Sequence, residues 1–275
     1  MTLPEQSPER PVVELVISIG DSLAKIIEAN GLDQRHGKST LNLLEPSRMR
    51  DFDDSIPSHY IVARAGSSGA TDPGGVAVLM DAPSCTLRLP AGRQLKIGHI
   101  GGLVDEIELI APLQSLNWDA MQAAVTALIA ELDGAGWVRT RDTYGPDRPI
   151  NEILTPEDFA NKVDGSWARV GSWAACDQPD VKAWVQVLHY NALSSATMTP
   201  PAVLGRPLPD DAPDTFLLLI RIQAEFDSPL EREMTRLRNA RRQEVTGSAE
   251  TPLPLALWIE DPDWRPAGWS SALLP

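Results

Sequence analysis

Hydrophobic residues recur along this chain with the two periods that distinguish strands from helices. Alternating runs, and short continuous apolar runs, predict strands. The predicted strands are 12–19, 60–64, 76–80, 86–89, 95–100, 104–110, 166–175, 181–190, 215–226 and 255–259, and a further strand is predicted to start at Trp137-Val138. The run 104–110 resembles a half-buried strand, because apolar Val104, Ile107 and Leu109 are interleaved with acidic residues.

Helical spacing of apolar residues predicts helices at 21–30, 117–132 and 229–245. The pattern is strongest in 117–132, where Asn117 is a favourable N-cap residue. Its apolar stripe consists of Met121, Val125, Leu128 and Leu132. We expect this helix to be a main element of the hydrophobic core.

The order of these elements predicts an α+β protein of two similar-sized lobes, each a mainly antiparallel sheet covered by a long helix. Residues 1–146 would form the N-terminal lobe, and residues 147–275 a tryptophan-rich C-terminal lobe. The order strand, helix, strand at 104–140 recurs at 215–259, which makes the two lobes candidates for a duplication.

The charge of the chain narrows the choice of partners. Its 24 basic and 38 acidic residues give a net charge of −14 at pH 7, and residues 1–150 and 151–275 contribute −7 each. Nucleic acids and anionic membranes require a basic surface. We therefore expect neither as a partner, and favour a basic protein.

The N-terminal residues bear on localisation. No apolar run reaches the roughly 18 residues that cross a bilayer. Residues 1–10 are polar and lack the basic start and apolar core of a signal peptide. The sequence as given predicts a cytoplasmic protein, whereas removal of a signal or anchor from a longer chain would place it in the periplasm.

The motif Gly20-Asp21-Ser22-Leu23 follows an apolar run and opens a predicted helix. It resembles the site at which GDSL-type lipases and esterases carry their nucleophile, over about ten residues. The resemblance implies a serine hydrolase that uses Ser22, with an Asp-x-x-His pair near the C-terminus. The last 86 residues contain no histidine. The alternative is that Asp21 or Ser22 caps the following helix, and we predict this structural role.

The sequence contains no complete cofactor or metal site. The acidic stretch 51–54 (Asp51, Asp53 and Asp54) lies near His59, but lacks the glycine and glutamate of a calcium-binding loop. Residues 31–39 have five residues between two glycines, where a phosphate-binding loop has four. We expect no cofactor, and interpret the three aspartates as a solvated loop and a candidate partner-binding surface.

Cys85 and Cys176 match no metal-binding spacing. We expect two buried free thiols, and the alternative is a disulfide between the two halves of the chain.

The predicted helix 229–245 is the one basic feature of the C-terminal half. Its arginines are Arg232, Arg236, Arg238, Arg241 and Arg242. Because apolar residues occupy another stripe, we expect the arginines to surround the outer face. This face is either a solvated surface with local ion pairs or a docking surface. In the second case Arg236, Arg238 and Arg242 are candidate partner-binding residues.

Tryptophan is unusually frequent after residue 150, where six of the eight tryptophans lie. Trp264 and Trp269 stand in the proline-containing tail, after the last predicted strand. Either the tail folds back into a groove, or the two rings are exposed anchors for a partner. We favour a tail that folds back, and retain both rings as candidate partner-binding residues.

Two segments resemble uncharacterised bacterial proteins that are encoded beside type VI secretion effectors. They are Ile-Gly-Asp-Ser-Leu-Ala-Lys-Ile-Ile-Glu-Ala-Asn-Gly at 19–31 and the strand-helix-Gly-Trp unit at 104–137. Many such proteins are immunity proteins. The resemblance implies a non-catalytic module that binds and inhibits a cognate toxin or effector. The alternatives are the hydrolase above and a structural or adaptor component of a secretion assembly.

Overall fold

The computed structural model describes residues 12–30, 53–54, 60–64, 75–80, 85–92, 94–140, 167–189 and 215–274. For residues 60–64 it describes the backbone. Within these ranges the protein is a mixed α/β structure in which most strand pairs are antiparallel. The predicted α+β class is confirmed at this level.

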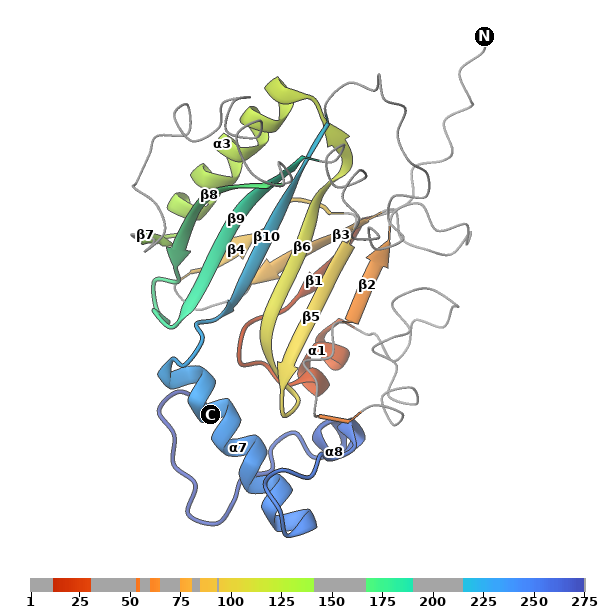
Figure 1. The fold of residues 1–275 in the computed structure, drawn as a ribbon, viewed down its shortest axis with the longest axis vertical. Helices are drawn as coiled ribbons and strands as arrows, with labels where there is room; N and C mark the ends of the chain where they lie inside the picture. Colours follow the sequence, from red (N-terminus) through yellow and green to blue (C-terminus); the bar gives the residue numbers. More distant parts are fainter. Residues whose placement is uncertain are drawn as a thin grey trace.

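A seven-stranded sheet forms the largest layer of the molecule (Figure 1). Its order is β2 (Tyr60–Arg64), β5 (Gln94–Ile100), β6 (Leu103–Leu116), β10 (Phe216–Ala224), β9 (Val181–His189), β8 (Trp167–Ala174) and β7 (Val138–Thr140). Every neighbouring pair is antiparallel.

The central strand pair of this sheet joins the two halves of the chain. β10 pairs with β6 on one edge and with β9 on the other, and the small edge strand β7 comes from the first half. One sheet therefore extends across the predicted boundary between residues 146 and 147. The predicted layout of two lobes with a sheet each is not confirmed.

A second, three-stranded sheet lies behind the large one in Figure 1. It contains β1 (Val12–Val16), β3 (Gly75–Met80) and β4 (Leu87–Arg88), and its β1–β3 pair is parallel. The helix α1 (Leu23–Ala29) follows β1. Asn30 ends this helix and ties it back to β1, because its side chain accepts from Val16 N and donates to Val16 O.

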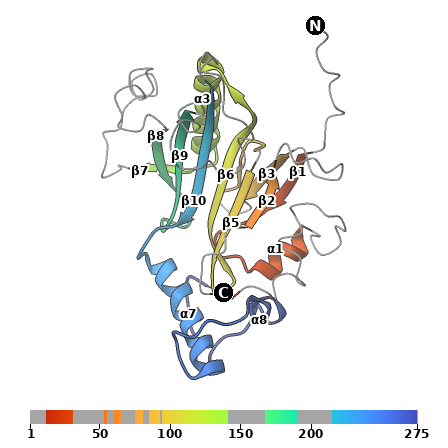
Figure 2. The same ribbon diagram turned by 45° about the vertical axis from the view of Figure 1, so that its right-hand side comes forward.

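The helix α3 (Trp118–Gly134) packs on the same side of the large sheet as the small sheet (Figures 1 and 2). Asn117 caps it by accepting from Ala120 N, and its four predicted stripe residues are buried. The predicted role of this helix in the core is confirmed. Among the described residues, no helix combines the length and the apolar character needed to cross a membrane.

The C-terminal segment forms a separate group of helices at one end of the sheet, containing α7 (Pro229–Thr246) and α8 (Leu255–Glu260). The prediction of a strand at 255–259 is wrong. Leu255 and Trp258 are buried and are three residues apart, which is the spacing of one helical face. A short apolar run cannot by itself distinguish a strand from a helix.

A glycine pair lets this helical group approach the sheet. Gly101 and Gly102 form the β5–β6 turn with φ angles of +54° and +72°, which favour glycine. A Cβ atom on Gly101 would lie 2.8 Å from Arg238 Cβ, and one on Gly102 would lie 2.5 Å from Trp258 Cβ. The turn therefore packs directly against α7 and α8.

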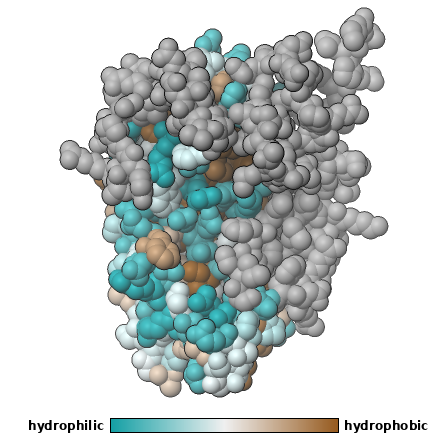
Figure 3. Space-filling model, in the orientation of Figure 1, coloured by the Kyte–Doolittle hydropathy of each residue, from teal (hydrophilic) through white to brown (hydrophobic). Residues whose placement is uncertain are grey.

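The other face of the large sheet carries charge. The described part of this face is mainly hydrophilic in Figure 3. Lys96, Glu108 and Arg221 lie in register on three adjacent strands, with ion-pair distances of 2.7 Å and 2.5 Å to Glu108. Burial raises the pKa of Glu108, but hydrogen bonds from Lys96 and Arg221 outweigh this effect, and its pKa lies below the usual value.

We expect Leu128→Ala to lower the free energy of unfolding by about 2–5 kcal/mol, because it removes a buried side chain and leaves a cavity. Val138→Ala is the matched control, since Val138 is 60% exposed, and surface changes stay within about 0.5 kcal/mol. Urea denaturation measures both. Similar losses for the two variants would contradict the assignment of Leu128 to the core.

Candidate functional site

Ser22 has a structural role at the start of α1. Its Oγ accepts a hydrogen bond from Lys25 N at 3.1 Å, and the Asp21 carboxylate accepts from Ser18 N and Lys25 Nζ. This geometry confirms the predicted N-cap. His36 and His59 lie outside the described residues. The described contacts thus place Ser22 and Asp21 in the turn that begins the helix.

Asp54 is buried, which corrects the prediction that it lies on a solvated acidic loop. Its Oδ1 accepts from Arg242 Nη2 and from Leu253 N, both at 2.8 Å, and its Oδ2 accepts from Trp258 Nε1 at 3.1 Å. The Arg242 side chain is buried too, with 7% of it exposed. The predicted partner-binding roles of Asp54 and Arg242 are therefore wrong: the pair holds α7 to the segments around it.

The neighbouring aspartates of that stretch are placed only in part. Asp53 is exposed and forms an isolated bridge with Pro254. Asp51 and His59 lie outside the described residues. The predicted grouping of these side chains as one surface stays a prediction for Asp51 and Asp53.

The C-terminal tail folds back on α7. The Arg241 guanidinium carbon lies 4.7 Å from the ring centroid of Trp258 and 5.2 Å from that of Trp264. Arg236 stacks on Trp269 at 3.7 Å. Both tail tryptophans are partly buried against the hydrophobic core. The favoured prediction of a tail that folds back is confirmed.

The arginines of α7 do not all surround its outer face, which corrects that expectation. Arg241 and Arg242 are buried, and Arg238 is partly buried where the β5–β6 turn packs on the helix. Burial lowers the pKa of Arg238 from its usual value. Arg232 and Arg236 remain on the surface, and each is paired with an acid of its own segment.

We expect Arg242→Ala to lower the free energy of unfolding by about 3–5 kcal/mol, because it leaves the buried Asp54 carboxylate without its charged partner. Arg232→Ala is the matched control on the same helix. Its pair with Asp227 is exposed on both sides and should give a far smaller loss. Urea denaturation of the two variants compares them, and equal losses would refute the structural role of Arg242.

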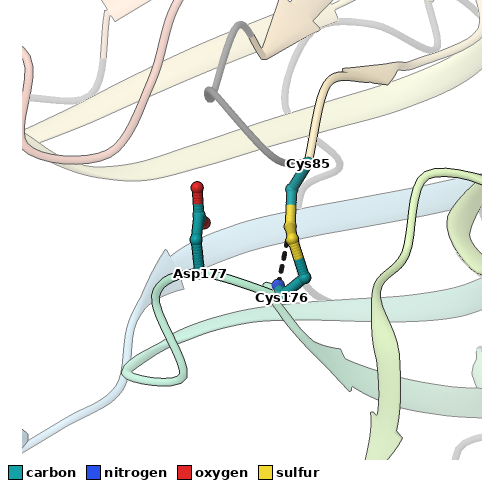
Figure 4. Close-up of side chains that lie close together, drawn as sticks. All are labelled: Cys85, Cys176 and Asp177. Carbon is teal, nitrogen blue, oxygen red and sulfur yellow. Dashed lines mark hydrogen bonds between the residues drawn. A yellow bond between two sulfur atoms is a disulfide. The ribbon is translucent and has the colours of Figure 1, made fainter.

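Cys85 and Cys176 form a disulfide between residues that precede β4 and follow β8 (Figure 4). The expectation of two free thiols is wrong. The Cα atoms are 5.9 Å apart, within the usual range for a disulfide. Asp177 lies beside the two sulfur atoms. Because both thiols are consumed by the bond, this group lacks the thiolates that a soft metal would require.

The most exposed large hydrophobic side chain among the described residues is Phe226, at 85%. It lies in the turn between β10 and α7. The sequence pattern included it as the last residue of a buried strand, but β10 ends at Ala224. The sequence analysis did not identify Phe226 as a candidate binding residue.

Hydrogen bonds fix the turn that carries Phe226. Ser228 begins α7 by accepting from Glu231 N, and the Glu231 carboxylate accepts in return from Asp227 N at 3.1 Å. The arrangement resembles a capping box, except that Glu231 accepts from Asp227, the residue before the N-cap, and not from the N-cap Ser228. The sequence contained its signal, since Ser228 and Glu231 have the required spacing. Asp227 adopts a left-handed conformation with φ of 57°, which sharpens the turn.

The β8–β9 turn also forms hydrogen bonds with the residues on both sides of Phe226. Glu225 N donates to the backbone oxygen of Asp180 at 2.7 Å, and Leu230 N donates to its carboxylate at 3.2 Å. Ser228 N also donates to Glu225 O. Hydrogen bonds therefore hold the backbone on both sides of Phe226, while its ring points into solvent.

The surroundings of Phe226 are acidic. The acidic residues of the two turns and the first turn of α7 are Asp177, Asp180, Glu225, Asp227 and Glu231. Lys182 and Arg232 balance them only in part, at 3.7 Å from Glu225 and 3.6 Å from Asp227. The Glu225 and Asp227 side chains are 52% and 68% exposed. The apolar ring of Phe226 is thus exposed in a region that carries these five acidic residues, which we call the acidic frame.

A partly buried acid, Asp105, lies close enough to Glu231 of this region for the two charges to interact. Burial raises the pKa of Asp105 to about 6, and the negative charges of Glu106 and Glu231 add to this increase. Such a group stabilises the fold below its ordinary pKa of 3.8, and this contribution is lost as the pH rises through about 6.

We therefore expect Asp105→Asn to be more stable than the wild type at pH 7, by up to about 3 kcal/mol for a shift of two units. Near pH 4 the two proteins should be similar. Denaturant unfolding measured from pH 4 to pH 7 tests this, and a pH-independent difference would contradict the burial of an ionisable carboxyl.

No known family model matches this chain, and no curated protein or solved structure matches it either. The functional assignment therefore rests on the geometry of the described residues.

Proposed function

We propose that this protein is a non-catalytic binding module that recognises another protein through the Phe226 turn. The observation that carries the proposal is the 85% exposure of an aromatic ring on a turn whose backbone is fixed on both sides. Aromatic side chains supply much of the binding energy of protein interfaces. A turn that is already ordered loses little conformational entropy on binding.

The acidic frame indicates the chemistry of the partner. Glu225 and Asp227 flank Phe226 in the sequence, and their side chains are more than half exposed. A partner that accepts Phe226 in an apolar pocket would gain from basic residues at the rim of that pocket. The net charge of −14 extends the same preference over the rest of the chain.

We propose further that the partner is a cognate bacterial effector or toxin, and that this protein is its immunity protein. The acidic charge and the resemblance of residues 19–31 and 104–137 to proteins encoded beside type VI effectors support this role. The Cys85–Cys176 disulfide favours the periplasm over the cytoplasm, because disulfides persist in oxidising compartments.

We expect Phe226→Ala to weaken the complex with the effector of the neighbouring gene by about 2 kcal/mol or more, roughly 30-fold in Kd. Val245→Ala is the control, since Val245 is also exposed, at 55%, but near the opposite end of α7. Isothermal titration calorimetry gives the affinities. Association should also be faster at low salt, because salt screens exposed charges.

Co-expression with the effector tests protection from toxicity with the same two variants. Loss of protection by Phe226→Ala alone would support the proposal. Absence of both a complex and protection in the wild type would overturn the immunity role. A wild-type complex that Phe226→Ala leaves unchanged would overturn the binding surface.

A further inference from the structure

A cleft lies between α3 and the segment that follows β4, on the side of the large sheet that faces the small sheet. Its volume is about 430 Å³, within the roughly 300–1,000 Å³ of ligand sites. Ala124, Ala127 and Leu128 form the wall on α3, and Leu89 to Ala91 form the facing wall. The floor comes from Ala77, Ala111, Pro112 and Leu218.

The small size of the lining side chains creates this space. Five of the lining residues are alanines and two are prolines, whose short side chains leave space between α3 and the sheet. Ala124 lies on α3 one residue before the buried Val125, so it turns an adjacent face of the helix toward the cleft. The walls offer an apolar ligand contact without side-chain hydrogen-bonding groups.

Two charged residues complete the lining, Arg88 on β4 and Glu131 near the end of α3. Arg88 pairs with Glu14 of β1 through one guanidinium nitrogen, and its side chain is 60% exposed. A guanidinium has five N–H donors in a planar fork. Arg88 can therefore bind a second carboxylate while it keeps its pair with Glu14.

We propose that this cleft binds a single-chain aliphatic carboxylate. Its hydrocarbon chain lies between the alanine face of α3 and the segment after β4, and its carboxylate accepts hydrogen bonds from Arg88. The apolar walls favour a hydrocarbon chain, because burial of apolar surface away from water is favourable. Arg88 favours a carboxylate head group because bidentate pairing of the two is specific. Glu131 would repel the same head group, so the binding of a carboxylate depends on its pairing with Arg88.

Calorimetric titration with dodecanoate, kept below its micelle concentration, tests the proposal. Dodecanol and dodecylamine serve as neutral and cationic probes of the same chain length. We expect saturable binding of dodecanoate, weaker binding of dodecanol, and the weakest binding of dodecylamine. Arg88→Gln should weaken dodecanoate at least fivefold and leave dodecanol unchanged.

Variants of α3 test the position of the hydrocarbon chain. Ala124→Leu should fill the cleft and weaken dodecanoate at least tenfold. Ala130→Leu is the matched control, because Ala130 is exposed on α3 and does not line the cleft. Ala127→Leu serves as a second filling variant if circular dichroism shows that Ala124→Leu has not folded.

Failure of the wild type to bind dodecanoate saturably would overturn the proposal. So would binding that the filling variants and Ala130→Leu affect equally, or stronger binding of dodecylamine than of dodecanoate. None of these outcomes bears on the Phe226 surface, which belongs to another part of the fold.

Discussion

The pairing of β10 with both β6 and β9 holds the two halves of this chain together. Residues more than a hundred positions apart, such as Ile110 and Leu219, face each other in the β6–β10 ladder. Both edges of β10 are used, so its backbone groups find partners within the sheet. Its inward side chains Ile220 and Ile222 have no exposed surface. Neither half contains this sheet alone, which makes the fold dependent on non-local contacts.

The same strand leads into the turn that presents Phe226. On one side the turn is anchored by β10 and Asp180, and on the other by a helix that the buried Asp54–Arg242 pair holds in place. Such a pair contributes a defined position rather than a large net stability, because desolvation offsets most of its Coulomb energy. The turn is therefore held in place by contacts with the interior of the protein. A fixed position makes an exposed aromatic ring suited to binding.

The acidic residues of the chain occupy environments with different consequences. Glu108 forms ion pairs within the sheet, Asp54 is paired with Arg242 in the interior, and Asp105 is partly buried near other acids. Glu225 and Asp227 remain exposed beside Phe226. The net charge alone therefore does not show which acidic residues are exposed; the tertiary structure decides this.

The sequence alone determined most of the elements and their local boundaries, because periodicity and capping depend on neighbouring residues. The α3 stripe, its Asn117 cap and the Ser22 cap followed from such signals. The exposure of Phe226, the burial of Arg242 and the helical state of residues 255–260 did not. A periodic pattern identifies one face of an element but not the element that covers it. Only the pairing of β10 with β6, and the docking of α7 and α8 on the β5–β6 turn, decided which side chains are buried and which remain exposed.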